Sequence, residues 1–152
     1  MSKHGRILVI DDDENIRKAL TMTLEGQGYR VEGAKDGKEA IEKSNSSFYN
    51  LALIDIRLPD MEGTALLSDM RDTTPRMVKI IITGYPSLDN AAEAANRGAD
   101  GYIVKPVKTE QLLSMIEEHL GKQQEELRYS ERKVAEYIET RAREHEAVER
   151  RR

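Results

Sequence analysis

The most informative pattern in this chain lies in Leu51–Gly63, which reads LALIDIRLPDMEG. Residues 51–54 form an uninterrupted apolar run, which is typical of a strand buried on both faces of a parallel sheet. Asp55 follows the run directly, and residues 57–63 contain the Pro, acidic residues and Gly of a loop. Because open α/β sheets bind ligands at the carboxyl ends of their strands, Asp55 is a candidate site residue. The alternative is that Asp55 caps the next helix or begins a turn, and this stretch alone does not separate the two.

The same pattern of a short apolar run followed by an amphipathic segment recurs along the chain. Five strands alternating with five helices predict right-handed crossovers and a doubly wound parallel sheet covered on both faces. The predicted strands are 6–10, 29–34, 51–55, 78–82 and 101–104, and the predicted helices are 15–27, 38–44, 64–71, 88–96 and one that begins near 109.

Length and composition limit the functions that the chain can have. Its 152 residues suffice for one domain with its own core plus an extension. A net charge of −4 gives no electrostatic reason to expect direct nucleic-acid binding. The absence of Cys excludes disulfides, thiolate nucleophiles and Cys-ligated zinc. No apolar run approaches the roughly 20 residues of a membrane helix, and no signal peptide is recognisable, so we expect a soluble cytoplasmic protein without a membrane partner.

Polar side chains stand at the ends of four predicted strands: Asp11 and Asp12, Asp55, Thr83, and Lys105. In a doubly wound sheet these strand ends lie on one edge, so the side chains can converge. Carboxylates brought together repel one another unless a cation joins them, and Mg²⁺ prefers such oxygen ligands. A neighbouring lysine and a hydroxyl group suit a phosphoryl group, for which Asp55 is the candidate nucleophile.

Four motifs, in this order, carry a family resemblance: ILVIDDD (7–13), LALIDIRLPDMEG (51–63), IIITG (80–84) and GYIVKP (101–106). On these motifs, the chain from about Arg6 to Leu120 resembles a response-regulator receiver domain, the CheY-like module of two-component signalling. The resemblance implies a flavodoxin-like (βα)5 fold with strand order 2-1-3-4-5. It also implies a phosphoacceptor signalling domain, not an enzyme with a separate substrate.

The resemblance assigns roles to the acidic residues and the lysine. Asp55 would accept a phosphoryl group from a sensor histidine kinase or a histidine phosphotransfer protein. Asp12, Asp55 and the backbone carbonyl of Arg57 would bind Mg²⁺, and Asp11 would act mainly through a metal-bound water. Lys105 would pair with the phosphoryl oxygens.

Further roles implied by the resemblance concern switching and local geometry. Thr83 would move toward the phosphoryl group, and Tyr102 would turn inward into the space that Thr83 leaves. Pro106 would follow a cis peptide bond that orients Lys105, and Gly63 would supply a tight turn. The surface that changes would comprise helix 88–96, strand 101–104 and the helix beginning near 109, and it would contact a downstream protein target.

Two bulky residues next to the site, Arg57 and Tyr85, occupy positions that influence phosphate lifetime in this family. Both could obstruct the water that hydrolyses the aspartyl phosphate, so slow self-dephosphorylation is predicted.

After residue 121 the composition becomes dominated by Glu, Arg and Lys, so we predict a receiver domain at 1–121 and a charged helical extension at 122–152. Leu120, Leu127, Val134 and Val148 lie on a seven-residue grid, but Arg141 fills the missing grid position. A solvated helix without a partner and a weak coiled coil are both consistent with this pattern. A homodimer is predicted through either this extension or the switching surface.

The leading function is a stand-alone response regulator or a phosphorelay intermediate. The alternative is the receiver portion of a longer regulator with a DNA-binding or enzymatic output domain. A Mg²⁺-dependent phosphotransferase or phosphatase is a third class. It is disfavoured because Arg57 occupies the second position of any D-x-D-like motif, where such an enzyme would want a general acid.

Overall fold

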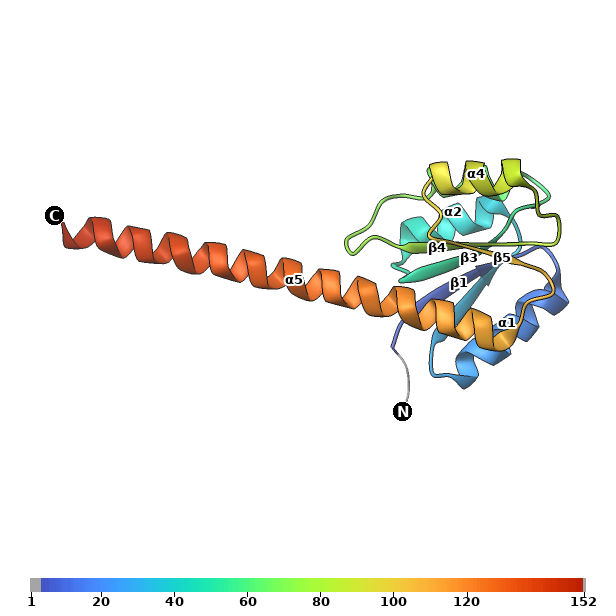
Figure 1. Ribbon diagram of the computed structural model, residues 1–152, viewed down its shortest axis with the longest axis horizontal. Coiled ribbons are helices and arrows are strands. Elements are labelled where there is room, and N and C mark those ends of the chain that lie inside the picture. The colour runs from blue at the N-terminus through green and yellow to red at the C-terminus, as the bar shows by residue number, and fades with distance from the viewer. Residues whose placement is uncertain (1–3, 152) are drawn as a thin grey trace.

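The computed structural model describes residues 4–151 and consists of a three-layer α/β body from which one long helix projects (Figure 1). The sheet is parallel with strand order β2-β1-β3-β4-β5, so the predicted fold class is confirmed. The elements are β1 (Arg6–Ile10), α1 (Glu14–Gly26), β2 (Arg30–Ala34), α2 (Gly37–Ser46), β3 (Leu51–Asp55), α3 (Gly63–Asp69), β4 (Val78–Thr83), α4 (Leu88–Asn96), β5 (Gly101–Val104) and α5 (Thr109–Arg150).

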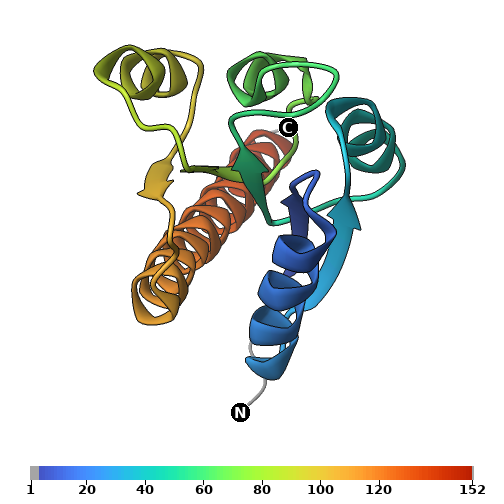
Figure 2. The same cartoon turned by 90° about the vertical axis from the view of Figure 1, so that its right-hand side faces the viewer.

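Helices cover both faces of the sheet, α1 and α5 on one face and α2, α3 and α4 on the other (Figure 2). Successive strand residues point to opposite faces and therefore join different core clusters. In β1, Ile7 and Val9 pack with Leu24 of α1 and Ile116 of α5. Leu8 and Ile10 belong to the opposite cluster, which includes Ala40, Leu66 and Ala94 from α2, α3 and α4.

Strands β3 and β4, which lie inside the sheet, are buried along their whole length. Each has a parallel neighbour on both edges and helices on both faces, which explains why the 51–54 run is apolar without alternation. The predicted elements all exist, with small shifts at their ends. Most notably, α2 continues to Ser46, and the buried Ser44 within its last turn donates its hydroxyl to the Ile41 carbonyl.

Helix α5 is 42 residues long and passes through Gly121 without interruption. Its last buried residue is Gln123, whose side-chain amide donates to the carbonyls of Asn50 (3.0 Å) and Arg76 (2.8 Å). These two residues precede β3 and β4, so Gln123 fixes α5 at the edge of the sheet opposite Asp55. The long C-terminal helix is thereby confirmed, whereas the division at residue 121 stays a prediction, and Arg152 lies outside the described residues.

Within residues 4–151, no helix is both long enough and apolar enough to cross a membrane.

Candidate functional site

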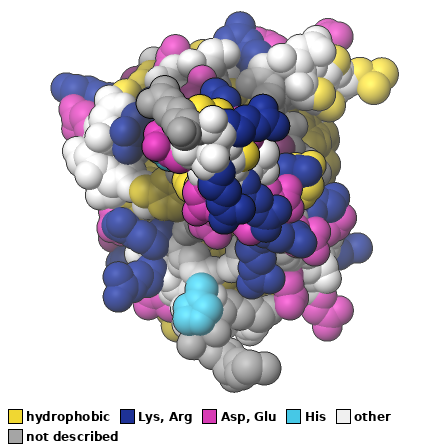
Figure 3. All heavy atoms as spheres, turned by 90° about the vertical axis from the view of Figure 1, so that its left-hand side faces the viewer, with side chains coloured by type: hydrophobic (Ala, Val, Ile, Leu, Met, Phe, Trp, Pro, Cys, Tyr) yellow, Lys and Arg dark blue, Asp and Glu magenta, His cyan; other side chains and the backbone are white. Residues whose placement is uncertain are grey.

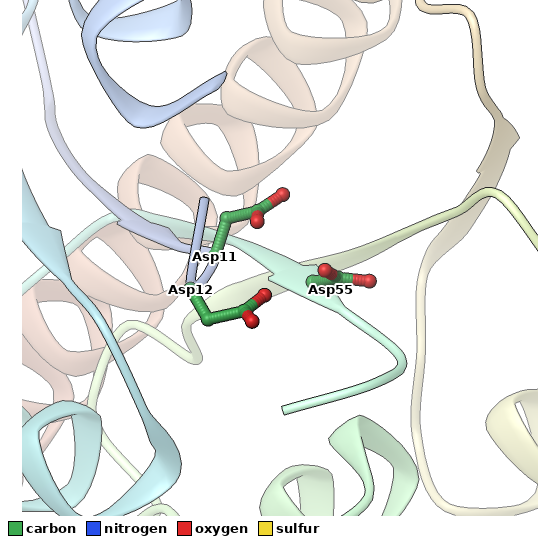
Figure 4. Close-up of side chains that lie close together, drawn as sticks. All are labelled: Asp11, Asp12 and Asp55. Atoms are coloured by element: carbon green, nitrogen blue, oxygen red, sulfur yellow. The ribbon is translucent and has the colours of Figure 1, made fainter. Parts of the chain in front are cut away.

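Three carboxylates converge at the carboxyl edge of the sheet: Asp11 and Asp12, which follow β1, and Asp55, which ends β3 (Figure 4). One oxygen from each lies within 4.8 Å of the others. The strands bring them together because β1 pairs directly with β3, with Ile10 beside Ile54. Residues more than 40 positions apart in sequence are thus adjacent at one point, as the strand-end argument predicted.

The three carboxylates differ in exposure. Asp11 and Asp55 are buried, with 3% and 7% of their surface exposed, whereas Asp12 is exposed. The Asp11 carboxylate accepts a hydrogen bond from the backbone N–H of Asp13 (2.9 Å), which fixes its orientation. Asp12 and Asp55 border an open cleft whose other lining residues are Arg57, Gly84, Tyr85 and Lys105. A ligand in this cleft can therefore reach Asp55 from solvent.

Lys105, just after β5, supplies the positive charge of the site. Its ammonium nitrogen lies 3.1 Å from Asp11 Oδ2 and 3.5 Å from Asp55 Oδ2. Burial raises the pKa of Asp55, and the charge of Asp11 raises it further, although Lys105 opposes both effects. Burial by itself lowers the pKa of Lys105, but the hydrogen bonds and charges of Asp11 and Asp55 outweigh burial, so its pKa is raised. One cation between two buried carboxylates leaves the site with excess negative charge.

The oxygen chemistry of the site fits a divalent cation. Asp11, Asp12 and Asp55 offer hard carboxylate oxygens close together, two of them buried, and within residues 4–151 the cation that forms ion pairs with them is Lys105. Mg²⁺ takes such ligands and usually keeps several waters, and the open cleft has room for them. The backbone carbonyl of Arg57 as a further ligand stays a prediction.

Thr83 and Tyr102, the predicted switch residues, lie on the neighbouring strands β4 and β5. Thr83 is fully buried, and its hydroxyl oxygen accepts a hydrogen bond from the Tyr85 backbone N–H (2.9 Å). Tyr102 is partly buried and packs against the core, and its hydroxyl is buried without a hydrogen-bond partner among the described residues. The Lys105–Pro106 peptide bond is cis, as the resemblance implied.

Arg57 and Tyr85, the two predicted lifetime residues, contact each other. The guanidinium carbon of Arg57 lies 3.6 Å from the centre of the Tyr85 ring, at the mouth of the cleft. The backbone N–H of Arg57 also donates to Asp55 Oδ1 (3.3 Å). Nothing in the sequence spacing of Arg57 and Tyr85 indicates that their side chains stack, so the contact is visible only in the folded chain.

Gly63 lies where the chain returns to the end of β3. Its backbone N–H donates to the Ile56 carbonyl (2.7 Å), and a Cβ atom at this position would lie 2.3 Å from the backbone oxygen of Asp55. The turn therefore requires glycine because of this close backbone approach.

Asp60 has a role that sequence analysis missed. Its carboxylate accepts hydrogen bonds from the backbone N–H groups of Gly37 and Lys38, both at 2.9 Å, and so caps the start of α2. These hydrogen bonds lower the pKa of Asp60. Asp55 makes no comparable cap, since α3 begins at Gly63 after Glu62. The acid of LALIDIRLPDMEG that caps a helix is therefore Asp60, and no local sequence signal connects it to a helix 23 residues earlier.

Residues 7–117 match the family model described as the response regulator receiver domain. The chain therefore belongs to the receiver domain family, whose members act as signalling modules of two-component systems and bind Mg²⁺ at an acidic pocket.

Among solved structures, the chain resembles a response regulator receiver domain protein (CheY-like) from Methanospirillum hungatei JF-1. The TM-score is 0.78 and the identity 47%, covering 82% of this chain and 99% of that one. It also resembles NtrX from Brucella abortus, with a TM-score of 0.76 and 29% identity over 86% of this chain and 30% of that one.

Among curated proteins, the transcriptional regulatory protein ZraR of Klebsiella oxytoca is 37% identical over 115 residues, which are 76% of this chain and 26% of ZraR. The DNA-binding transcriptional regulator NtrC of Escherichia coli K12 is 33% identical over 124 residues, 82% of this chain and 26% of NtrC. The chain thus spans about a quarter of the length of these relatives.

Proposed function

We propose that Asp55 is the phosphoryl acceptor of this receiver domain. The observation that carries the proposal is the position of its carboxylate, which ends the buried central strand, borders an open cleft and lies 3.5 Å from the Lys105 ammonium. Asp11 and Asp12 complete the acidic cluster. A nucleophilic oxygen beside a fixed cation is the arrangement that phosphoryl transfer requires.

In the proposed reaction, a carboxylate oxygen of Asp55 attacks the phosphorus of a phosphohistidine on a sensor kinase or a histidine phosphotransfer protein. A P–O bond forms, the P–N bond breaks, and the imidazole nitrogen leaves with the electron pair. Lys105 neutralises the phosphoryl oxygens through its ammonium group. Asp11, Asp12 and Asp55 would hold Mg²⁺, which when bound adds further neutralising charge on those oxygens.

The conformational response would begin at Thr83 and Tyr102. Thr83 would exchange its present hydrogen bond from the Tyr85 backbone for one to the new phosphoryl group. Tyr102 lies on β5, next to the strand that carries Thr83, and its buried hydroxyl has no hydrogen-bond partner among the described residues. The α4–β5–α5 surface would then change its affinity for a downstream protein, as expected of a two-state equilibrium biased by phosphorylation.

The α4–β5–α5 surface has apolar side chains available for such a partner. Leu88 at the start of α4 is 89% exposed, and Val104 at the end of β5 is 47% exposed. Aliphatic groups exposed next to a switch are suited to contact another protein, because they gain burial only when the partner is bound.

The stacked Arg57 and Tyr85 side chains would slow loss of the phosphoryl group. They lie together at the mouth of the cleft that a hydrolytic water must enter. Their contact restrains two side chains that would otherwise move independently in solvent.

Two biological settings agree with this chemistry, both in the cytoplasm, where kinases are phosphorylated from ATP. The domain acts either as a stand-alone or phosphorelay regulator, or as the input module of a longer regulator with a separate output domain. The lengths of ZraR and NtrC favour the second setting, since each contains much sequence beyond the matched region.

The test is phosphorylation with a small phosphodonor, such as acetyl phosphate, in the presence of Mg²⁺, followed by intact-mass measurement. We expect one phosphoryl group per chain, lost on addition of EDTA during labelling or in Asp55→Asn. Asp69→Asn, a change of an exposed acid on α3, is the matched control and should label normally. Continuous turnover of phosphodonor without a labelled protein, or full labelling of Asp55→Asn, would contradict the proposal.

A further inference from the structure

The face of α5 that packs on the body continues past the body as an unpartnered stripe. Within the body this face carries Leu120, which is buried, and Leu127 lies partly buried at its edge. Farther along, Val134 and Ile138 continue the same face but are 58% and 62% exposed. Because Val134 and Ile138 lie one turn apart on the same face, they form a small exposed apolar patch that a second helix can cover.

The stripe has coiled-coil spacing. Its members alternate in steps of four and three residues, which is the pattern that keeps one face of a helix toward a partner helix. We call this set the α5 seam: Leu127, Glu131, Val134, Ile138, Arg141, His145 and Val148. The seven-residue grid described above contains Leu127, Val134, Arg141 and Val148. The seam adds the residues four positions after the first three of these, and one of the added residues, Ile138, is apolar.

We propose that the α5 seam pairs with the α5 seam of a second copy of this chain, in antiparallel orientation, with Val134 opposite the partner's Ile138. By symmetry Ile138 then lies opposite the partner's Val134, and the two-fold axis passes near Glu136. This pairing covers the two most exposed apolar residues of the seam with each other.

Charge complementarity selects this orientation. With Val134 opposite the partner's Ile138, the antiparallel repeat places Glu131 opposite the partner's Arg141, and Arg141 opposite the partner's Glu131. A parallel, in-register pair would instead place Glu131 against Glu131 and Arg141 against Arg141. Like charges at facing seam positions are destabilising. Glu131 and Arg141 therefore disfavour the parallel pair and favour the antiparallel pair.

The register is also specified. Sliding the antiparallel pair by one heptad in one direction places Ile138 opposite the partner's Arg141, and in the other direction places Glu131 opposite the partner's Val134. Either shift buries a charge against an aliphatic side chain, which is costly without a compensating partner. The register centred near Glu136 pairs Val134 with Ile138 and Glu131 with Arg141 at its centre, and it places Leu127 opposite the partner's His145.

The geometry of the molecule accommodates this pairing. The seam between Leu127 and His145 extends about 28 Å at roughly 1.5 Å per residue. The body's last buried contact is Gln123, so each body would lie beyond one end of the paired segment. At the centre, Ala135 would lie beside the partner's Ala135, and this small side chain allows close approach of the helices. Figure 3, which looks at the molecule from the C-terminal end of α5, shows basic and acidic side chains intermingled on that end of the molecule.

Existing contacts within the helix do not prevent the pairing. Arg141 contacts the Glu144 carboxylate and the Tyr137 hydroxyl, both at 3.2 Å, and all three residues are exposed. Ion pairs on exposed helix surfaces contribute little and are easily exchanged. Glu131 makes no ion pair within the described residues and is available to the partner's Arg141.

The first experiment is sedimentation equilibrium of the full chain over a range of concentrations, without phosphodonor. We expect a monomer–dimer equilibrium. Glu131→Arg and Arg141→Glu should each weaken dimerisation at least about tenfold, since each converts two attractive pairs into repulsive ones. The double variant Glu131→Arg/Arg141→Glu should restore it. Glu125→Arg and Arg132→Glu make the same charge changes on the opposite side of the helix and should leave the dimer unchanged.

The second experiment measures orientation directly. The chain has no cysteine, so Glu146→Cys provides a single site for a nitroxide label away from the seam. In the antiparallel dimer the two labels should be separated by about 30 Å along the helix axis, because Glu146 lies near the level of the partner's Glu126. In a parallel dimer the labels would lie side by side.

Several results would overturn the proposal: a monomer at every concentration, a trimer, a short label distance, or no rescue by the double variant. The proposal concerns the unphosphorylated chain and does not depend on Asp55. Repeating the sedimentation with Asp55→Asn therefore separates failure of the pairing from failure of the proposed phosphoryl transfer.

Discussion

The guanidinium carbon of Arg57 lies 3.6 Å from the centre of the Tyr85 ring, which joins the loop after β3 to the loop after β4 across the mouth of the acidic cleft. A planar guanidinium stacks well on an aromatic ring, and the two side chains are held by each other and not by the core. The pair is therefore best understood as one shielding unit made from two strand ends.

Removing either member of this pair should shorten the lifetime of the phosphorylated state. We expect Arg57→Ala and Tyr85→Ala each to speed hydrolysis several-fold, and the double variant to be little faster than either single one, because each removes the same stack. Tyr85→Phe keeps the ring and is the matched control. The measurement is loss of label after removal of phosphodonor. An unchanged half-life in the double alanine variant would disprove shielding.

Asp55→Asn should stabilise the metal-free protein. The pKa of Asp55 is raised in the folded state above its ordinary value of 3.8, so the unfolded chain releases this proton first as the pH rises. Ionisation of Asp55 therefore lowers the free energy of unfolding from about pH 4 upward. At pH 7 in EDTA we expect the Asn variant to gain about 1 kcal/mol in urea unfolding.

The advantage of Asp55→Asn should disappear toward pH 3, where the wild-type carboxyl is also neutral. Mg²⁺ should stabilise the wild type more than the Asn variant, because it binds the carboxylate only in the folded state. A variant less stable than wild type in EDTA at neutral pH would contradict this account.

Gly63→Ala should be strongly destabilising. Its Cβ would meet the Asp55 backbone oxygen at 2.3 Å and the Ile56 Cα at 2.8 Å, so the loop would have to move. We expect a loss of at least about 2 kcal/mol and reduced phosphorylation. Gly121→Ala is the matched control: nothing lies within 4 Å of its Cβ position in α5, and it should gain up to about 1 kcal/mol. Equal effects at the two positions would refute the steric argument.

Alkaline stability should depend on Tyr49. Burial and the hydrogen bond to Glu32 raise the pKa of Tyr49 to about 12, so its phenol ionises in the unfolded chain before the folded one. Wild-type stability should therefore fall as the pH rises from 10 toward 12. Tyr49→Phe should cost about 1 kcal/mol at pH 7 by losing a hydrogen bond. That deficit should shrink between pH 10 and 12, and a constant deficit would contradict the assignment.

Much of the body could be predicted from the sequence because its signals are local. The run Leu51–Ile54 identified a strand buried on both faces, and β3 is buried throughout. Polar residues placed directly after such runs identified the carboxyl edge of the sheet, where Asp11, Asp12 and Asp55 do converge. The chemical role of these carboxylates stays a proposal. Their placement follows from local sequence patterns, whereas their reactivity depends on the ligand that binds.

Other features depended on contacts between residues distant in sequence. Asp60 caps α2 across 23 positions, and Gln123 fixes α5 by hydrogen bonds to the chain before β3 and β4. The stack of Arg57 on Tyr85 likewise joins two loops. No periodicity or motif marks these pairs, because side-chain hydrogen bonds and ring contacts are set by the path of the backbone in three dimensions.

The order of elements, the parallel sheet and the acidic strand ends could all be predicted from the sequence, because apolar periodicity and strand-end residues show which segments are buried. The folded chain was needed to show how far Lys105 lies from each carboxylate and where α5 leaves the body. These follow from packing: the distances depend on how the strands twist and pair, and the exposed α5 seam is defined by where the body ends.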